Sequence, residues 1–89
     1  MVFNDTCRSG FVWREAVAGD HVCVTPETRQ LAWDDNARAA ERVAPGSDRC
    51  RSGFVWREVI PSDHVCVPPS TRSAAAADTA LAPQRVAGN

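Results

Sequence analysis

Four cysteines and two histidines carry most of the chemistry that this sequence could perform. The set recurs at a constant offset of 43 residues and comprises Cys7, His21 and Cys23, then Cys50, His64 and Cys66. Residues of these types could form disulfides, bind zinc, or supply a thiolate nucleophile with an imidazole base. Which of these applies depends on how the fold places the two cysteines of each pair.

The spacing of the cysteines favours one disulfide in each half of the chain. Three pairings are formally possible, but only Cys7–Cys23 with Cys50–Cys66 makes each half self-sufficient. A bridge that closes a loop of about 15 residues is worth roughly 3 kcal/mol in the chain-entropy model. That contribution is large for a unit of about 40 residues, which can bury only a small core. We therefore predict these two disulfides.

Two other interpretations of the same residues stay open. Cys7, His21 and Cys23 could give zinc two thiolates and an imidazole, but an H-x-C spacing is unusual in zinc sites and leaves the fourth ligand unnamed. A catalytic thiol would need a free, partly exposed thiolate in both halves. We expect no metal, no cofactor and no catalytic residue, and we expect each histidine to be half-buried and held by an arginine or by the preceding aspartate, Asp20 or Asp63.

A tandem repeat must position these residues. The nine residues at 7–15, Cys-Arg-Ser-Gly-Phe-Val-Trp-Arg-Glu, return unaltered at 50–58, and a shift of 43 residues aligns the two halves without a gap. A period of this size is typical of supersecondary units that are too small to bury a core alone. The predicted units are 5–46 and 48–89.

Each unit is predicted to begin with a β-hairpin. Residues 11–15 are rich in aromatic and β-branched residues and alternate in character, which favours a strand. Residues 17–20 have turn chemistry, and residues 21–24 then form the returning strand. The hairpins should therefore span about 11–24 and about 54–67.

A helix should follow each hairpin. Threonine directly before Pro26 is typical of an N-cap with proline at the first helical position, and the helix should run over about 26–43. The second helix should start at 69 and reach about 82 or 86, because Pro83 should break or kink its last turn. The sequence thus predicts a small α+β protein of two ββα units, each stapled by one disulfide.

Comparison of the two units shows which polar residues the architecture needs. All ten basic residues are arginine, a side chain suited to fixed, bidentate pairing with carboxylates. We predict that Asp35 pairs with Arg29, Arg42 or Arg14; a solvated stripe of charge is the alternative. The predicted structural polar residues are Arg14, His21, Asp35 and Arg42 in the first unit and Arg57, His64, Asp78 and Arg85 in the second.

Four large apolar residues are candidate contacts with a partner. Trp13 and Trp56 offer flat aromatic faces to a sugar ring in both units, although packing against the helix accounts for them more simply. Leu31 and Trp33 are replaced by alanine in the second unit. The fold therefore does not need them, and they are candidates for an interface that only the first unit makes. Trp33 should either anchor a partner or shield the junction between the units.

Charge and hydropathy argue against two kinds of partner. The formal net charge is -1, so no electrostatic field would gather a nucleic acid. No apolar run approaches the roughly 20 residues of a membrane span. Residues 1–5 lack the charged and apolar regions of a signal peptide, which predicts either a cytosolic protein or a form whose leader has been removed.

The whole pattern C-x2-GFVWRE-x4-DHVCV-x-P-x2-R, followed by an alanine-rich helix, resembles an uncharacterised repeat. That repeat occurs, often in tandem, in exported proteins of actinobacteria and other soil bacteria. The resemblance covers nearly the whole chain and implies an exported, disulfide-bonded accessory module without catalytic residues. We therefore expect a secreted, non-enzymatic module that binds another protein or assembles with itself. The alternatives are sugar binding through Trp13 and Trp56 and a structural subunit that forms oligomers or filaments.

Overall fold

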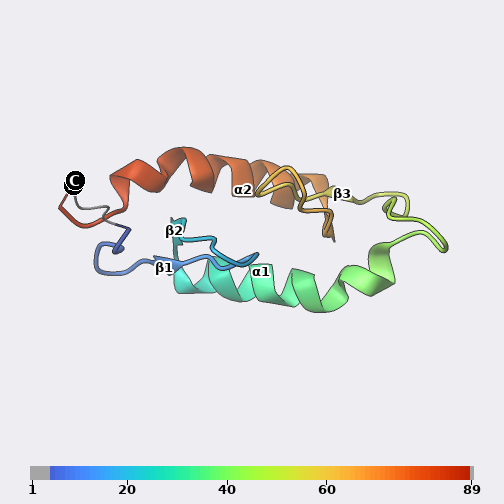
Figure 1. Ribbon diagram of the computed structural model, residues 1–89, viewed down its shortest axis with the longest axis horizontal. Helices are drawn as coiled ribbons and strands as arrows, with labels where there is room; N and C mark the ends of the chain where they lie inside the picture. The colour runs from blue at the N-terminus through green and yellow to red at the C-terminus, as the bar shows by residue number, and fades with distance from the viewer. Residues whose placement is uncertain (1–4, 89) are drawn as a thin grey trace.

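The computed structural model describes residues 5–88, which form an elongated body of 46 × 25 × 19 Å with the two long helices side by side (Figure 1). Residues 1–4 and Asn89, the predicted end of the second unit, lie outside the described residues. The elements, with η for a 3₁₀ helix, are β1 Val12–Trp13, β2 Cys23–Val24, α1 Pro26–Arg38, η1 Ala39–Arg42, β3 Val55–Trp56, β4 Cys66–Val67, α2 Pro69–Leu81 and η2 Ala82–Gln84. The predicted fold class is confirmed.

The hairpins are antiparallel and have the same register in both units. β1 pairs with β2, and β3 with β4, over two residues each. The strands are shorter than the sequence predicts because the Asp20 carboxylate takes over part of the ladder, accepting hydrogen bonds from the N–H groups of Ala16 and Val22 at 3.1 and 3.4 Å. A turn closed by the Asp20 N–H and the Val17 carbonyl then completes the hairpin.

Both helices change from α to 3₁₀ geometry at equivalent residues. The predicted N-cap of α1 is confirmed, since the Thr25 hydroxyl accepts the Thr28 N–H at 3.3 Å. The second α-helix ends at Leu81, near the earlier of its two predicted ends, and Pro83 lies in the 3₁₀ turn that follows. Pro83 is not needed for this change of geometry, since α1 also has 13 residues and η1 forms without a proline. Just after each 3₁₀ turn, Val43 or Val86 forms an isolated bridge with the start of the other unit.

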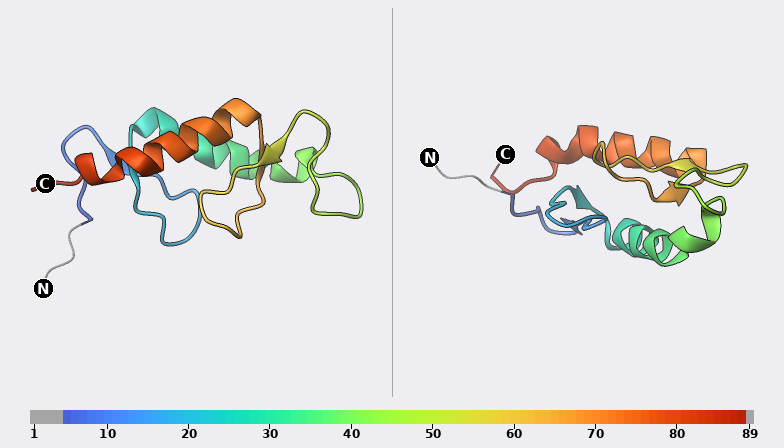
Figure 2. Two further views of the ribbon diagram at one scale, coloured as in Figure 1. Left: turned by 90° about the horizontal axis from the view of Figure 1, so that it is seen from above. Right: turned by 45° about the vertical axis from the view of Figure 1, so that its right-hand side comes forward.

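Two isolated bridges connect the end of each unit to the start of the other. Val43 forms an antiparallel bridge with Cys50, at the start of the second unit, and Val86 forms the same bridge with Cys7, at the start of the first. The beginning of the first hairpin and the end of α2 consequently meet at one end of the body (Figure 2). The two units therefore meet at two junctions. The chain runs directly through the first, whereas the second is made by contacts between residues far apart in the sequence.

The apolar core is small and centred on the cystines. The predicted disulfides Cys7–Cys23 and Cys50–Cys66 are confirmed. Buried apolar residues in the described range are Ala16, Cys23, Val24, Ala32, Cys66 and Val67. No helix within residues 5–88 is long and apolar enough to cross a membrane. With so little apolar burial, covalent bridges and buried polar contacts must supply much of the stability.

Candidate functional site

A buried ion pair lies inside each hairpin. The Arg14 guanidinium donates to both carboxylate oxygens of Asp20, at 2.7 and 3.1 Å, and Arg57 does the same to Asp63 at 2.8 and 3.2 Å. All four side chains are almost completely removed from solvent. Such bidentate, charge-assisted pairs fix the orientation of the arginine as well as adding energy.

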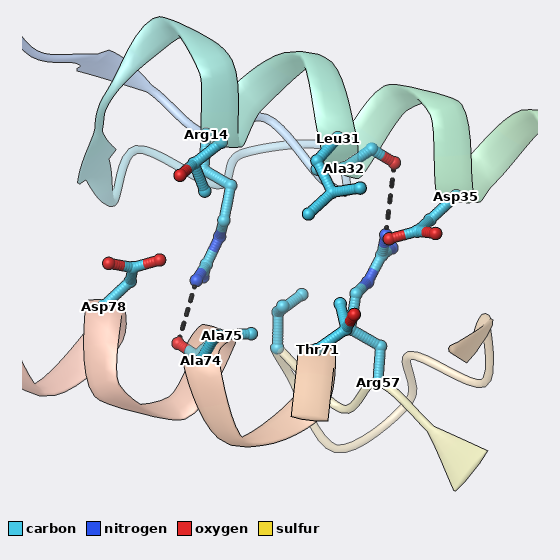
Figure 3. Close-up of a pocket in the computed structure, with 11 residues that line it drawn as sticks. Arg14, Leu31, Ala32, Asp35, Arg57, Thr71, Ala74, Ala75 and Asp78 are labelled. Atoms are coloured by element: carbon cyan, nitrogen blue, oxygen red, sulfur yellow. Dashed lines mark hydrogen bonds between the residues drawn. The ribbon is translucent and has the colours of Figure 1, made fainter. Parts of the chain in front are cut away.

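Each of these arginines also reaches the helix of the other unit. Arg14 donates to the carbonyl of Ala75 and the hydroxyl of Thr79 on α2, both at 3.2 Å. Arg57 donates to the carbonyl of Ala32 on α1 at 3.4 Å. Figure 3 shows the two guanidinium groups crossing between the helices. Each ion pair therefore ties its own hairpin to the opposite unit.

A cavity of about 80 Å³ lies between α1 and α2. Most of its lining residues are pairs related by the repeat, namely Arg14 and Arg57, Thr28 and Thr71, Leu31 and Ala74, Ala32 and Ala75, Asp35 and Asp78. Only the Leu31 and Ala74 pair differs in residue type, and Leu31 points into the space between the helices (Figure 3). The cavity thus lies where the two units face each other, and Leu31 belongs to their junction.

A second arginine holds each helix tail to the opposite hairpin. The Arg42 guanidinium donates to Asp35 at 2.9 Å and to the carbonyl of Cys66 at 3.1 Å, and it lies 5.0 Å from the centre of the Phe54 ring. Of the three partners predicted for Asp35, Arg42 is confirmed. Arg85 makes the equivalent contacts in the second unit, with Asp78, Cys23 and Phe11.

Arg42→Ala is expected to lower the free energy of unfolding by about 3 kcal/mol, because it leaves the Asp35 carboxylate buried and unpaired. Arg85→Ala should cost roughly half as much, because the Asp78 side chain is 19% exposed against 5% for Asp35 and water can partly solvate it. Urea denaturation of both variants checks the order. Equal losses would show that carboxylate burial does not set the cost.

An aromatic ring stacks on a histidine in each unit. Trp13 lies 3.6 Å from His21, centre to centre and nearly parallel, and its indole N–H donates to the Asp5 carbonyl at 2.8 Å. The His21 Nδ1 contacts the Asp5 carboxylate. Trp56, His64 and Asp48 repeat this cluster.

The prediction that the preceding aspartate or an arginine holds each histidine is wrong. Asp20 is taken by Arg14, and Asp5 holds His21 instead. Both tryptophans are half-buried, and the imidazole stacks on one face of each ring. Sequence reasoning missed Asp5 and Asp48 as partners; their recurrence at the repeat offset was the available signal. The sugar-binding interpretation of Trp13 and Trp56 stays a prediction.

Trp33 lies apart from Leu31, on another face of α1. Its indole N–H donates to the Glu15 carbonyl at 3.3 Å, the Arg29 guanidinium lies 4.9 Å from its ring centre, and its side chain is 42% exposed. Arg29 and Glu15 also form an ion pair at 3.7 Å. These contacts are all with the first unit, so they do not support the alternative that Trp33 shields the junction, where Leu31 lies instead.

The disulfides decide between the alternatives for the cysteines. All four sulfurs are bonded in pairs, so the thiolates that zinc ligation or nucleophilic catalysis would need are not formed in this state. Within the described part of the chain, no three His, Cys, Asp or Glu side chains gather closely enough to hold a metal ion. No family model, curated protein or solved structure matches this chain.

Proposed function

We propose that this protein is a disulfide-stapled module that binds another protein outside the cytoplasm, with Trp33 on α1 as its main contact. The main support is that the Trp33 side chain is exposed and held in place. The second unit folds the same way with alanine at the equivalent position. The fold does not require this tryptophan.

The surroundings of Trp33 suit a protein contact. The Glu15 carbonyl and the Arg29 guanidinium fix the ring before a partner arrives, which lowers the entropy lost on binding. Tryptophan and arginine are the residue types most enriched among contacts that dominate binding energy. Glu15 and Arg29 would form a polar rim around an apolar centre, as interfaces commonly do.

The disulfides support the proposed location. Each bridge connects parts of one unit and contributes to a core that is otherwise very small. Bridges of this kind form and persist in oxidising compartments and are rare in the cytosol. A small secreted domain stapled in this way is a common solution to insufficient apolar burial.

Trp33→Ala should weaken binding of the partner strongly while leaving the fold unchanged. Loss of an anchoring tryptophan commonly costs about 2 kcal/mol or more, which is roughly a 30-fold weaker Kd, whereas stability should change by less than about 0.5 kcal/mol. The full chain, immobilised with its disulfides intact, would first be used to isolate a binding protein from an extracellular fraction. Calorimetry with the purified partner and thermal unfolding then measure the two effects.

Ile60→Ala is the matched control, because Ile60 is similarly exposed, at 44%, but lies in the second unit. It should bind like the unchanged protein. Two results would contradict the proposal: a partner that binds Trp33→Ala with unchanged Kd, or a large fall in melting temperature showing that Trp33 serves the fold.

A further inference from the structure

The two junctions between the units are made by the same contacts. At the first junction, Arg51 N–H donates to the Arg42 carbonyl and Ala44 N–H to the Arg49 carbonyl, both at 2.7 Å. At the second, Arg8 N–H donates to the Arg85 carbonyl at 2.8 Å and Ala87 N–H to the Thr6 carbonyl at 2.7 Å. The arginine and phenylalanine contacts described above repeat in the same way.

One difference separates the junctions. The first is connected through the loop at residues 44–49, whereas the second joins parts of the chain that are far apart in sequence. Since the second junction forms without that connection, a helix tail recognises a hairpin through its contacts alone. A hairpin on another molecule would present the same groups.

The disulfides leave this recognition free to occur between molecules. Each bridge lies within one unit, Cys7–Cys23 in the first and Cys50–Cys66 in the second. Whole units can therefore separate and recombine without reduction. The segment that must change is the loop at 44–49, whose turn depends on Gly46 at a φ of +74°.

We propose that a second copy of this chain is a binding partner of the junction surfaces: two chains exchange whole units by extending the loop at 44–49. In each half of the resulting dimer, the first unit of one chain packs on the second unit of the other. Every junction contact is kept, including those from Arg14 and Arg57 to the opposite helix. Exchange of identical elements is a low-cost route to a dimer because only the hinge differs between the two states.

Gly46→Val tests the proposal because it penalises only the closed loop. A Cβ at Gly46 would meet no other atom within 4 Å, so the substitution strains the backbone without a clash. A β-branched residue disfavours positive φ but accepts an extended loop. The dimer-to-monomer equilibrium constant should rise by at least roughly ten-fold.

Gly19→Val is the matched control. Gly19 has a φ of +78° and equally open space, but it lies in the turn of the first hairpin and not in the hinge. This variant should be destabilised and stay monomeric. Trp33→Ala combined with Gly46→Val should still dimerise, so that failure of the proposed protein contact and failure of exchange are told apart.

The full-length chains would be unfolded in guanidinium with disulfides intact, refolded at low and high concentration, and analysed by light scattering after size-exclusion chromatography. We expect a Gly46→Val dimer that persists on dilution, because separating exchanged chains requires unfolding. A monomer, or a dimer that dissociates promptly on dilution, would overturn the proposal. If Gly46→Val does not fold, the unchanged chain decides: refolding at high concentration must give a dilution-resistant dimer, and monomer alone refutes exchange.

Discussion

Reduction of the two disulfides is expected to unfold the whole protein at room temperature. Each bridge joins cysteines 16 residues apart and should contribute about 3 kcal/mol through the unfolded state. Together they are comparable with the entire stability of a small domain, about 5–15 kcal/mol. Cys23 and Cys66 are also fully buried parts of the core. Far-UV circular dichroism with and without reductant measures the loss.

Removing only one bridge tests whether the two units unfold together or independently. The double substitution of Cys7 and Cys23 by alanine should destabilise both units in one cooperative transition, because Arg14 and Arg57 tie each hairpin to the opposite helix. A second unit that melts separately, at the temperature of the unchanged protein, would contradict a shared core.

Arg57→Met is expected to cost about 3–5 kcal/mol, because it leaves the Asp63 carboxylate buried without its partner. Asp63 also accepts hydrogen bonds from the N–H groups of Val59 and Val65. Replacing it with an apolar residue as well would therefore leave buried donors unsatisfied and should not restore stability. Arg72→Met is the control: Arg72 pairs with Glu58 at 3.5 Å on the surface, where such pairs contribute about 0–1 kcal/mol. Urea denaturation compares the variants.

Protonation of Asp63 is expected to lower the free energy of unfolding at low pH. Burial raises the pKa of Asp63, but the hydrogen bond from Arg57, those from Val59 and Val65 and the charge of Arg57 outweigh burial and hold the pKa below its ordinary value. A group whose pKa is lower in the folded state stabilises the fold above its unfolded pKa, about 3.9, and loses that contribution as pH falls through the folded pKa.

Unfolding free energy should therefore be retained above about pH 4 and decline below it. In Arg57→Met the pKa of Asp63 should rise, because burial then acts with less opposition. The loss of unfolding free energy below about pH 4 should therefore become smaller, or reverse in sign if the folded pKa rises above the unfolded one. Denaturation midpoints measured across this range test the shift. An Arg57→Met profile that parallels the unchanged protein would show that Asp63 does not control the acid transition.

Features that depend on neighbouring residues or on the repeat could be predicted from the sequence. The disulfides, the ββα order and the Thr25 cap follow from spacing and local chemistry. The sequence did not predict that Val86 returns to Cys7, because periodicity does not reveal where the last repeat ends in space. The closed arrangement is a property of the pair of units, not of either one.

Two misassigned side chains show a similar limit at the candidate site. Asp20 directly precedes His21, which suggested that they pair, yet the hairpin turns the Asp20 carboxylate inward to Arg14. Leu31 and Trp33 were grouped because both become alanine in the second unit. Residues two apart on a helix point in different directions, so only Leu31 lines the cavity between the helices. Comparison of the two units identified the positions at which they differ, but not what the side chains at those positions contact.

The hydrogen bond between Ala87 N–H and the Thr6 carbonyl, at 2.7 Å, places the two ends of the described chain side by side. Neighbouring strands are separated by about 5 Å, so polypeptide attached at either side would leave the body from nearly one point. The fold could thus be inserted into a surface loop of a host domain without forcing the flanks of that loop apart. Trp33, which is 42% exposed, would then stay accessible to solvent on α1 of the inserted body.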